Sequence, residues 1–206
     1  MLTVSVPSLT DEFGFRWGAS SVHTSRTMML AELTQVLDRV PADSSAATYA
    51  TAIVEENVLG KPTRATRLRT AQRLAELYAL DPACPIFRIL RFYWSGGGEG
   101  RLMLAFLLAC ARDPLLRECT PQVLAVPRGQ VLMPAEIGIW LGEKYPGRFR
   151  ATTQHSTAQN LASSWAQAGI LRGVTICGNP SLPPLSKRSS RFLRVLGDIA
   201  KRAPWS

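Results

Sequence analysis

The stretch TRATRLRTAQRLAELYAL, residues 63–80, carries the strongest helical periodicity in a chain of 206 residues. Apolar side chains recur there at the three- and four-residue spacing of one helix face. These positions are Leu68, Ala71, Leu74, Ala75 and Tyr78. At about 100° per residue, Thr66, Arg69 and Arg73 fall on the opposite face. The stretch therefore predicts an amphipathic helix that packs on one side and is basic on the other.

Two shorter helices are predicted before this one. Residues 25–40 show helical periodicity up to Pro41, and residues 46–57 follow the cap candidates Ser44 and Ser45. Three helices joined by short turns, with a basic third helix, are typical of a helix-turn-helix, whose second motif helix enters the major groove of DNA. A charged outer face is equally typical of a solvated surface helix, and both interpretations stay open.

The sequence SGGGEG, residues 95–100, predicts a boundary between two helical subdomains. No phosphate-binding or dinucleotide-binding motif follows these glycines, so we interpret them as a linker. The expected organisation is residues 1–94, the linker 95–100 and residues 101–206. Residues 101–111 are apolar on almost all sides, which predicts a helix at the centre of the core. The apolar run 102–111 is too short to cross a bilayer.

The second half is predicted to be helical with a small β element. Helices are expected at residues 115–126, 134–145 and 154–168, with a short strand at 129–133. We also expect a wing-like hairpin within residues 172–185, with its turn at Gly178-Asn179. A basic tail helix is expected over residues 186–203. The expected fold class is all-α with a small β wing, carrying helix-turn-helix and winged-helix-like motifs.

The charge balance favours a polyanionic partner. There are 24 Lys and Arg against 15 Asp and Glu, giving a formal charge of +9, and the basic excess lies after residue 50. A hydrophobic fraction of 46% with 19% charged residues excludes disorder for most of the chain. High Arg content also arises from genome base composition, so charge alone does not decide the partner.

The sequence offers no recognisable catalytic or metal-binding set. Four cysteines are widely spaced without a C-x-x-C pair, and the two histidines, His23 and His155, lie far apart in sequence. Motifs of metalloproteases, serine hydrolases and phosphate-binding loops are absent. We therefore expect no enzyme activity, no cofactor and no metal. The first residues contain neither a basic leader nor a sustained apolar region, which predicts a cytoplasmic protein with no membrane partner.

Two other binding functions remain as alternatives. The aromatic residues Phe92, Tyr93 and Trp94 are the only candidates for stacking on unpaired RNA bases, although such rings more often pack in a core. A protein adaptor would instead display an exposed apolar patch.

The chain resembles the BrxA family, small helical proteins of bacteriophage-exclusion (BREX) defence systems. The resemblance runs from about residue 20 to 190 and rests on the E-N-x-L-x-K-x-T element at residues 56–63, the basic helix after it, and the apolar helix 102–111. Its last part is Ser156-Thr157 with Leu161 and residues 168–171. The glycine-rich insert at 95–100 is not a feature we associate with that family.

The resemblance implies a non-enzymatic, mainly helical protein that binds double-stranded DNA. It would act with the methyltransferase and ATPase of a BREX antiviral defence system and confer phage resistance. An RNA-binding role like that of antitermination factors, or an adaptor role in the same complex, is the alternative. From the basic helix, the later polar helix and the tail, the expected DNA-binding residues are Lys61, Thr63, Arg64, Thr66, Arg67, Arg69, Arg73, Ser156, Thr157, Gln159, Asn160, Lys187, Arg188 and Arg191.

Overall fold

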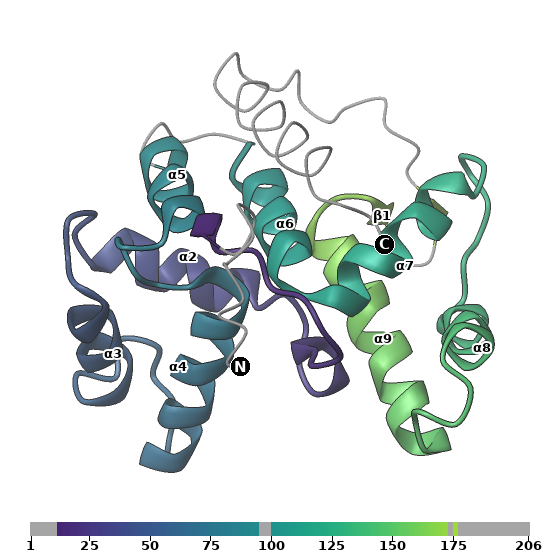
Figure 1. Ribbon diagram of the computed structural model, residues 1–206, viewed down its shortest axis with the longest axis horizontal. Helices are drawn as coiled ribbons and strands as arrows, with labels where there is room; N and C mark the ends of the chain where they lie inside the picture. Colours follow the sequence, from purple (N-terminus) through teal and green to yellow (C-terminus); the bar gives the residue numbers. More distant parts are fainter. Residues whose placement is uncertain (1–11, 95–99, 173–174, 177–206) are drawn as a thin grey trace, which may run out of the picture.

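A computed structural model describes residues 12–94, 100–172 and 175–176 of the chain (Figure 1). Its elements are η1 (Val22–Thr24), α2 (Leu30–Arg39), α3 (Ala46–Val54), α4 (Arg64–Tyr78), α5 (Pro85–Trp94), α6 (Gly100–Arg112), α7 (Pro114–Ala125), α8 (Pro134–Lys144), α9 (Ala151–Gln167), β1 (Leu171–Arg172) and β2 (Thr175–Ile176). The fold is mainly helical with one small β element, which confirms the predicted fold class.

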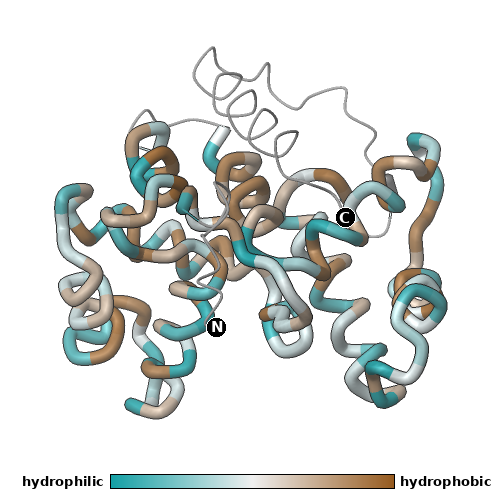
Figure 2. Tube along the Cα trace, viewed as in Figure 1, coloured by the Kyte–Doolittle hydropathy of each residue, from teal (hydrophilic) through white to brown (hydrophobic). Residues whose placement is uncertain are grey.

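Helix α6 lies at the centre of the molecule, as its apolar sequence predicts. Its side chains from Met103 to Phe106 are at most 9% exposed, and it packs against α4, α5 and α7. Figure 2 shows most of α6 in the colours of apolar residues. Within the described ranges, no helix is long and apolar enough to cross a membrane. The buried side chains before residue 95 and after residue 100 belong to one continuous core, and the division into two subdomains stays a prediction.

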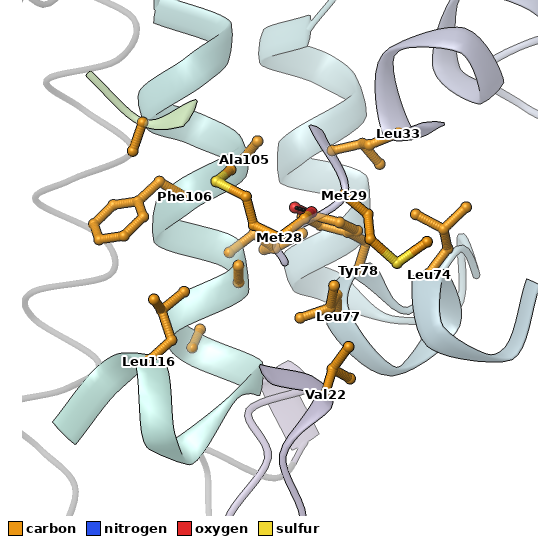
Figure 3. Close-up of a cluster of buried hydrophobic side chains, with 14 of the residues drawn as sticks. Val22, Met28, Met29, Leu33, Leu74, Leu77, Tyr78, Ala105, Phe106 and Leu116 are labelled. Carbon is orange, nitrogen blue, oxygen red and sulfur yellow. Dashed lines mark hydrogen bonds between the residues drawn. The ribbon is translucent and has the colours of Figure 1, made fainter. Parts of the chain in front are cut away.

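The chain just before α2 is not helical and passes through the core. Met28 is fully buried between α4 and α6, close to Tyr78 and Ala105 (Figure 3). Its N–H donates to Oγ of Ser164 over 2.8 Å, and Met29 adopts a left-handed backbone with φ of 51°. The helix predicted from residue 25 therefore begins only at Leu30.

Helix α4 is present where the sequence places it, but its buried face differs from the prediction. Thr63 is its N-cap, with Oγ1 accepting a hydrogen bond from the Thr66 N–H. Leu74 and Tyr78 are buried, whereas Leu68 is 45% exposed. The prediction for Leu68 is wrong because no side chain of α4 before Thr70 is buried. The first turns of α4 project beyond the helices that cover its C-terminal half (Figure 1).

Other boundaries also shift. Helix α3 ends at Val54 and not at Asn57, which has a left-handed φ of 51°. Helix α5 was not predicted from the sequence, although its apolar face packs on α6. The helices predicted at 101–111, 115–126, 134–145 and 154–168 are confirmed as α6 to α9, with boundary changes of a few residues.

Within the described residues the β element is one pair of short strands, and the rest of the predicted hairpin, residues 177–185, lies outside them. Strands β1 and β2 pair antiparallel, with Leu171 opposite Ile176 and Arg172 opposite Thr175. The connection therefore spans residues 173–174, and a turn at Gly178-Asn179 is not the one that joins this pair. The strand predicted at 129–133 is reduced to a single bridge between Val131 and Thr175. The tail helix predicted over 186–203 lies outside the described residues.

Candidate nucleic-acid interface

Two pairs of consecutive helices, α3 with α4 and α8 with α9, reach the same edge of the molecule (Figure 1). In each pair a glycine with positive φ precedes the second helix: Gly60 at 62° and Gly147 at 72°. Glycine adopts this backbone without the steric cost that a Cβ imposes. The side chains around the first turns of α4 and α9 are mostly exposed, so this edge is the candidate interface.

Three of the five cations predicted on the α4 side form ion pairs. Nζ of Lys61 lies 3.0 Å from Glu32, in a contact whose two side chains are about a quarter exposed. Arg64 lies 2.8 Å from Glu55, and Arg73 lies 2.8 Å from Glu76 one turn along the helix. Exposed ion pairs of this kind contribute about 0–1 kcal/mol, so a phosphate can compete for these cations.

Arg69 is the most available cation of α4. Its side chain is exposed and forms no hydrogen bond or ion pair with the described residues. Arg67 is half-buried, and its Nε has no hydrogen-bond partner in the described part of the chain. Thr63 and Thr66 are occupied in capping the helix, with their hydroxyls 2.9 Å apart. Of the predicted α4 residues, Arg64 and Arg69 best combine charge with exposure.

The predicted α9 residues do not form one common surface. Gln159 is exposed, and Ser156 bonds the carbonyl of Thr153. Thr157 is fully buried, so its assignment as a DNA contact is wrong. Asn160 donates through its side-chain amide to the carbonyl of His23 over 2.9 Å, so the amide N–H group is already used in a hydrogen bond within the protein. The inward stripe containing Leu161 is confirmed, since Leu161 is fully buried.

Two exposed arginines before α9 were missed. Arg148 lies over the rings of Tyr145 and Phe149, 4.7 and 4.9 Å from their centroids, and donates to the carbonyl of Ala19. Arg150 is the N-cap of α9, and its side chain is exposed without a capping bond. The sequence carries a signal for them, because no Asp or Glu occurs between Glu143 and Asp198.

The predicted tail contacts Lys187, Arg188 and Arg191 lie outside the described residues. They stay predictions.

The structure assembles a buried polar cluster that sequence spacing did not reveal. Oγ of Ser164 donates to the carbonyl of Asn160 over 2.8 Å, so the Nε2 atom of His23, 3.0 Å away, is the donor to Oγ. On the other side of the ring, Nδ1 lies 3.1 Å from Oδ2 of Asp113, an ion-pair distance at an angle poor for a hydrogen bond. Asp113 also accepts from the Ser21 hydroxyl and the Val22 N–H.

This cluster has the side-chain types of a Ser-His-Asp triad but not its accessibility. His23 and Ser164 are 0% exposed and Asp113 is 1% exposed. The only hydroxyl hydrogen of Ser164 bonds a carbonyl, and its oxygen also accepts from the Met28 N–H. A nucleophile must reach its substrate, and this serine does not. We interpret the cluster as a clamp that holds the segment before α2 against α7 and α9.

The electrostatics of Asp113 fit that role. Burial opposes its ionisation, but the charge of His23 and the hydrogen bonds from Leu116 and Ser21 outweigh burial and lower the pKa of Asp113 to about 2. A carboxylate so stabilised in the folded state links folding to pH.

The thiols of Cys110 and Cys119 are poor nucleophiles. Burial raises the pKa of Cys110 to about 12 and that of Cys119 to about 11. Both groups are therefore protonated near neutral pH, whereas the thiolate is the reactive form. Among the described residues, no group of three or more His, Cys, Asp or Glu is arranged to hold a metal ion.

No protein-family model matches the sequence, and no curated protein matches it.

Proposed function

We propose that the protein binds double-stranded DNA without catalysis, and that the exposed face of α4 contacts the duplex. The observation that carries this proposal is the exposed arginine face of α4 at the end of a helix pair. In helix-turn-helix proteins, the N-terminal residues of the second motif helix reach the base edges of the major groove. Arginine also binds phosphate and guanine in bidentate fashion.

The net charge supports the same partner. A chain with formal charge +9 attracts nucleic acid, and its phosphate contacts release counterions from the duplex. Binding of this type weakens steeply as salt concentration rises. The BrxA-like sequence features extend the proposal to a component of a BREX phage-defence system, acting beside its methyltransferase and ATPase.

Replacing Arg64 and Arg69 together with glutamine should weaken duplex binding. If each arginine contacts one phosphate, the slope of log K against log salt should become less steep by about 1.8, with a loss of affinity of about 30-fold at 0.15 M salt. Fluorescence anisotropy with a labelled duplex of about 24 base pairs measures both quantities, the length covering two helical turns.

The matched control is Arg88→Glu. This exposed residue lies on α5, away from the edge formed by the ends of α4 and α9, and its reversal changes the net charge by the same amount as the double variant. The control should bind within about twofold of wild type, since its position contacts no phosphate in the proposed complex. Equal affinities of the double variant and wild type would remove α4 as the binding surface.

Parallel titrations with single-stranded DNA and hairpin RNA separate this proposal from the RNA alternative. Trp94 is 2% exposed and its Nε1 donates to Asp38, so this ring does not stack on a base in the folded protein. Phe92, at 65% exposed, is the accessible ring of that cluster. RNA binding lost on Phe92→Ala, with no affinity for duplex DNA, would favour the alternative over our proposal.

A further inference from the structure

Helices α4 and α9 share a sequence pattern as well as a position in a helix pair. Residues 70–78 read TAQRLAELY and residues 157–165 read TAQNLASSW. Aligned this way, the N-cap Thr63 falls on the N-cap Arg150, and Gly60 falls on Gly147. The glycines share a positive φ, so the similarity includes the turn that leads into each helix.

The similarity extends to the first helix of each half. In α2, residues 32–37 read ELTQVL, and in α7, residues 118–124 read ECTPQVL, which has Cys119 in place of Leu33 and one inserted proline. Each segment is followed by a Val-Pro pair before the next helix, at residues 40–41 and 126–127. Two three-helix units, α2 to α4 and α7 to α9, separated by α5 and α6, therefore repeat the same order of sequence features.

The matched residues play the same structural parts. The hydroxyl of Thr70 donates to the carbonyl of Thr66 over 2.8 Å, and that of its counterpart Thr157 donates to the carbonyl of Thr153 over 2.7 Å. Both threonines are buried. Periodicity alone does not require a buried threonine at this point, so their agreement supports a true repeat.

The aromatic residue that ends each pattern also has one role. Tyr78 and Trp165 are fully buried. The Tyr78 hydroxyl donates to the carbonyl of Met28, just before α2, and the Trp165 Nε1 donates to Thr120 in α7. Each aromatic side chain therefore joins the third helix of its unit to the first: α4 to the residues just before α2, and α9 to α7.

The two units are arranged as an inverted pair. In Figure 1, α4 and α9 diverge toward the same lower edge, with α3 on the left of α4 and α8 on the right of α9. A simple translation would place α3 and α8 on the same side of their partners. The arrangement resembles the two-fold symmetry of dimeric helix-turn-helix proteins, whose second motif helices read two inverted half-sites.

We propose that the second unit is also a DNA-binding unit, so that one chain contacts two inverted segments of a single duplex. This inference rests on the proposed DNA binding and extends it to a bipartite site. The exposed residues Arg148 and Arg150 occupy the turn positions that match Lys61 and Thr63. Neither arginine forms an ion pair within the described part of the chain, whereas Lys61 and Arg64 pair with Glu32 and Glu55.

The test is the double variant Arg148→Gln with Arg150→Gln, measured beside Arg64→Gln with Arg69→Gln and the Arg88→Glu control. With a duplex of about 24 base pairs, each double variant should lower affinity about 30-fold at 0.15 M salt and reduce the salt slope by about 1.8. Arg148 also packs on two aromatic rings, so the double variant could lose affinity by disturbing the fold. The single variant Arg150→Gln leaves that packing in place and controls for this effect. That single change should lower affinity about fivefold with an unchanged melting temperature.

Hydroxyl-radical footprinting of the wild-type complex completes the test. Two protected segments, centred about 10 base pairs apart on a duplex bound by one chain, are expected. One protected segment, or an unchanged affinity and salt slope in both the Arg148/Arg150 double variant and Arg150→Gln, would overturn the bipartite site while leaving binding by α4 in place. Absence of duplex binding by wild type would instead overturn the proposed function, and the bipartite site with it.

Discussion

Replacing Asp113 with asparagine should lower the free energy of unfolding by about 3 kcal/mol, because it removes the buried carboxylate that satisfies the Ser21 hydroxyl and two backbone N–H groups. Asp113 is 1% exposed and accepts hydrogen bonds from Ser21 and from the N–H groups of Val22 and Leu116. The segment before α2 depends on these contacts for its position. Urea unfolding at pH 7, followed by circular dichroism, measures the loss.

The pH profile identifies the physical cause of that loss. Because the folded-state pKa of Asp113 is lowered to about 2, its contribution is present above about pH 4, the ordinary carboxyl range, and is lost as pH falls toward 2. The stability difference between wild type and Asp113→Asn should therefore narrow over that interval. Asp43→Asn, at an exposed loop position, is the control and should change stability by less than about 0.5 kcal/mol. A difference that stays constant down to pH 2 would contradict the role given to this carboxylate.

Combining the four substitutions Arg64→Gln, Arg69→Gln, Arg148→Gln and Arg150→Gln should reduce duplex affinity about 1000-fold at 0.15 M salt. The estimate assumes four phosphate contacts, each contributing about 0.9 to the salt slope. Independent contributions from two separated units should add, since sites without shared partners usually behave additively. Anisotropy titrations over a salt series measure the loss, and the melting temperature verifies the fold.

The same variant distinguishes one surface from two. If only α4 binds, the variant with all four substitutions should bind the duplex as tightly as the double variant Arg64→Gln with Arg69→Gln. A thousandfold loss reproduced by the Arg148/Arg150 pair alone would assign binding to the second unit and contradict the contribution of α4.

The strongly periodic parts of the fold were predictable from sequence. Residues 102–111 are apolar on almost every side, and such a helix has no stable place except at the centre of a core, where α6 lies. Local periodicity also placed α4, although Thr63, which the predicted helix includes, is its N-cap. Tertiary contacts determine the rest. Met28 is buried and its N–H bonds to Ser164, so α2 begins at Leu30 and not at residue 25, where local periodicity places its start.

The candidate site was only partly predictable for a related reason. Sequence spacing identified Arg64 and Arg69, but the exposure of each depends on how far α4 projects from its neighbours. Thr157 has the polarity of a surface residue, yet its hydroxyl is satisfied within the helix and the side chain is buried. The match between residues 70–78 and 157–165 was visible in the sequence, and an internal comparison would have directed attention to Arg148 and Arg150.

The most direct test of the account is the salt dependence of duplex binding by wild-type protein, measured by anisotropy from about 0.05 to 0.3 M salt. Binding that depends on at least four phosphate contacts predicts a log–log slope of about −3.6 or steeper, with weaker binding to hairpin RNA. A slope near zero, or no duplex binding at the lowest salt concentration, would contradict the claim that this chain binds DNA through its exposed arginines.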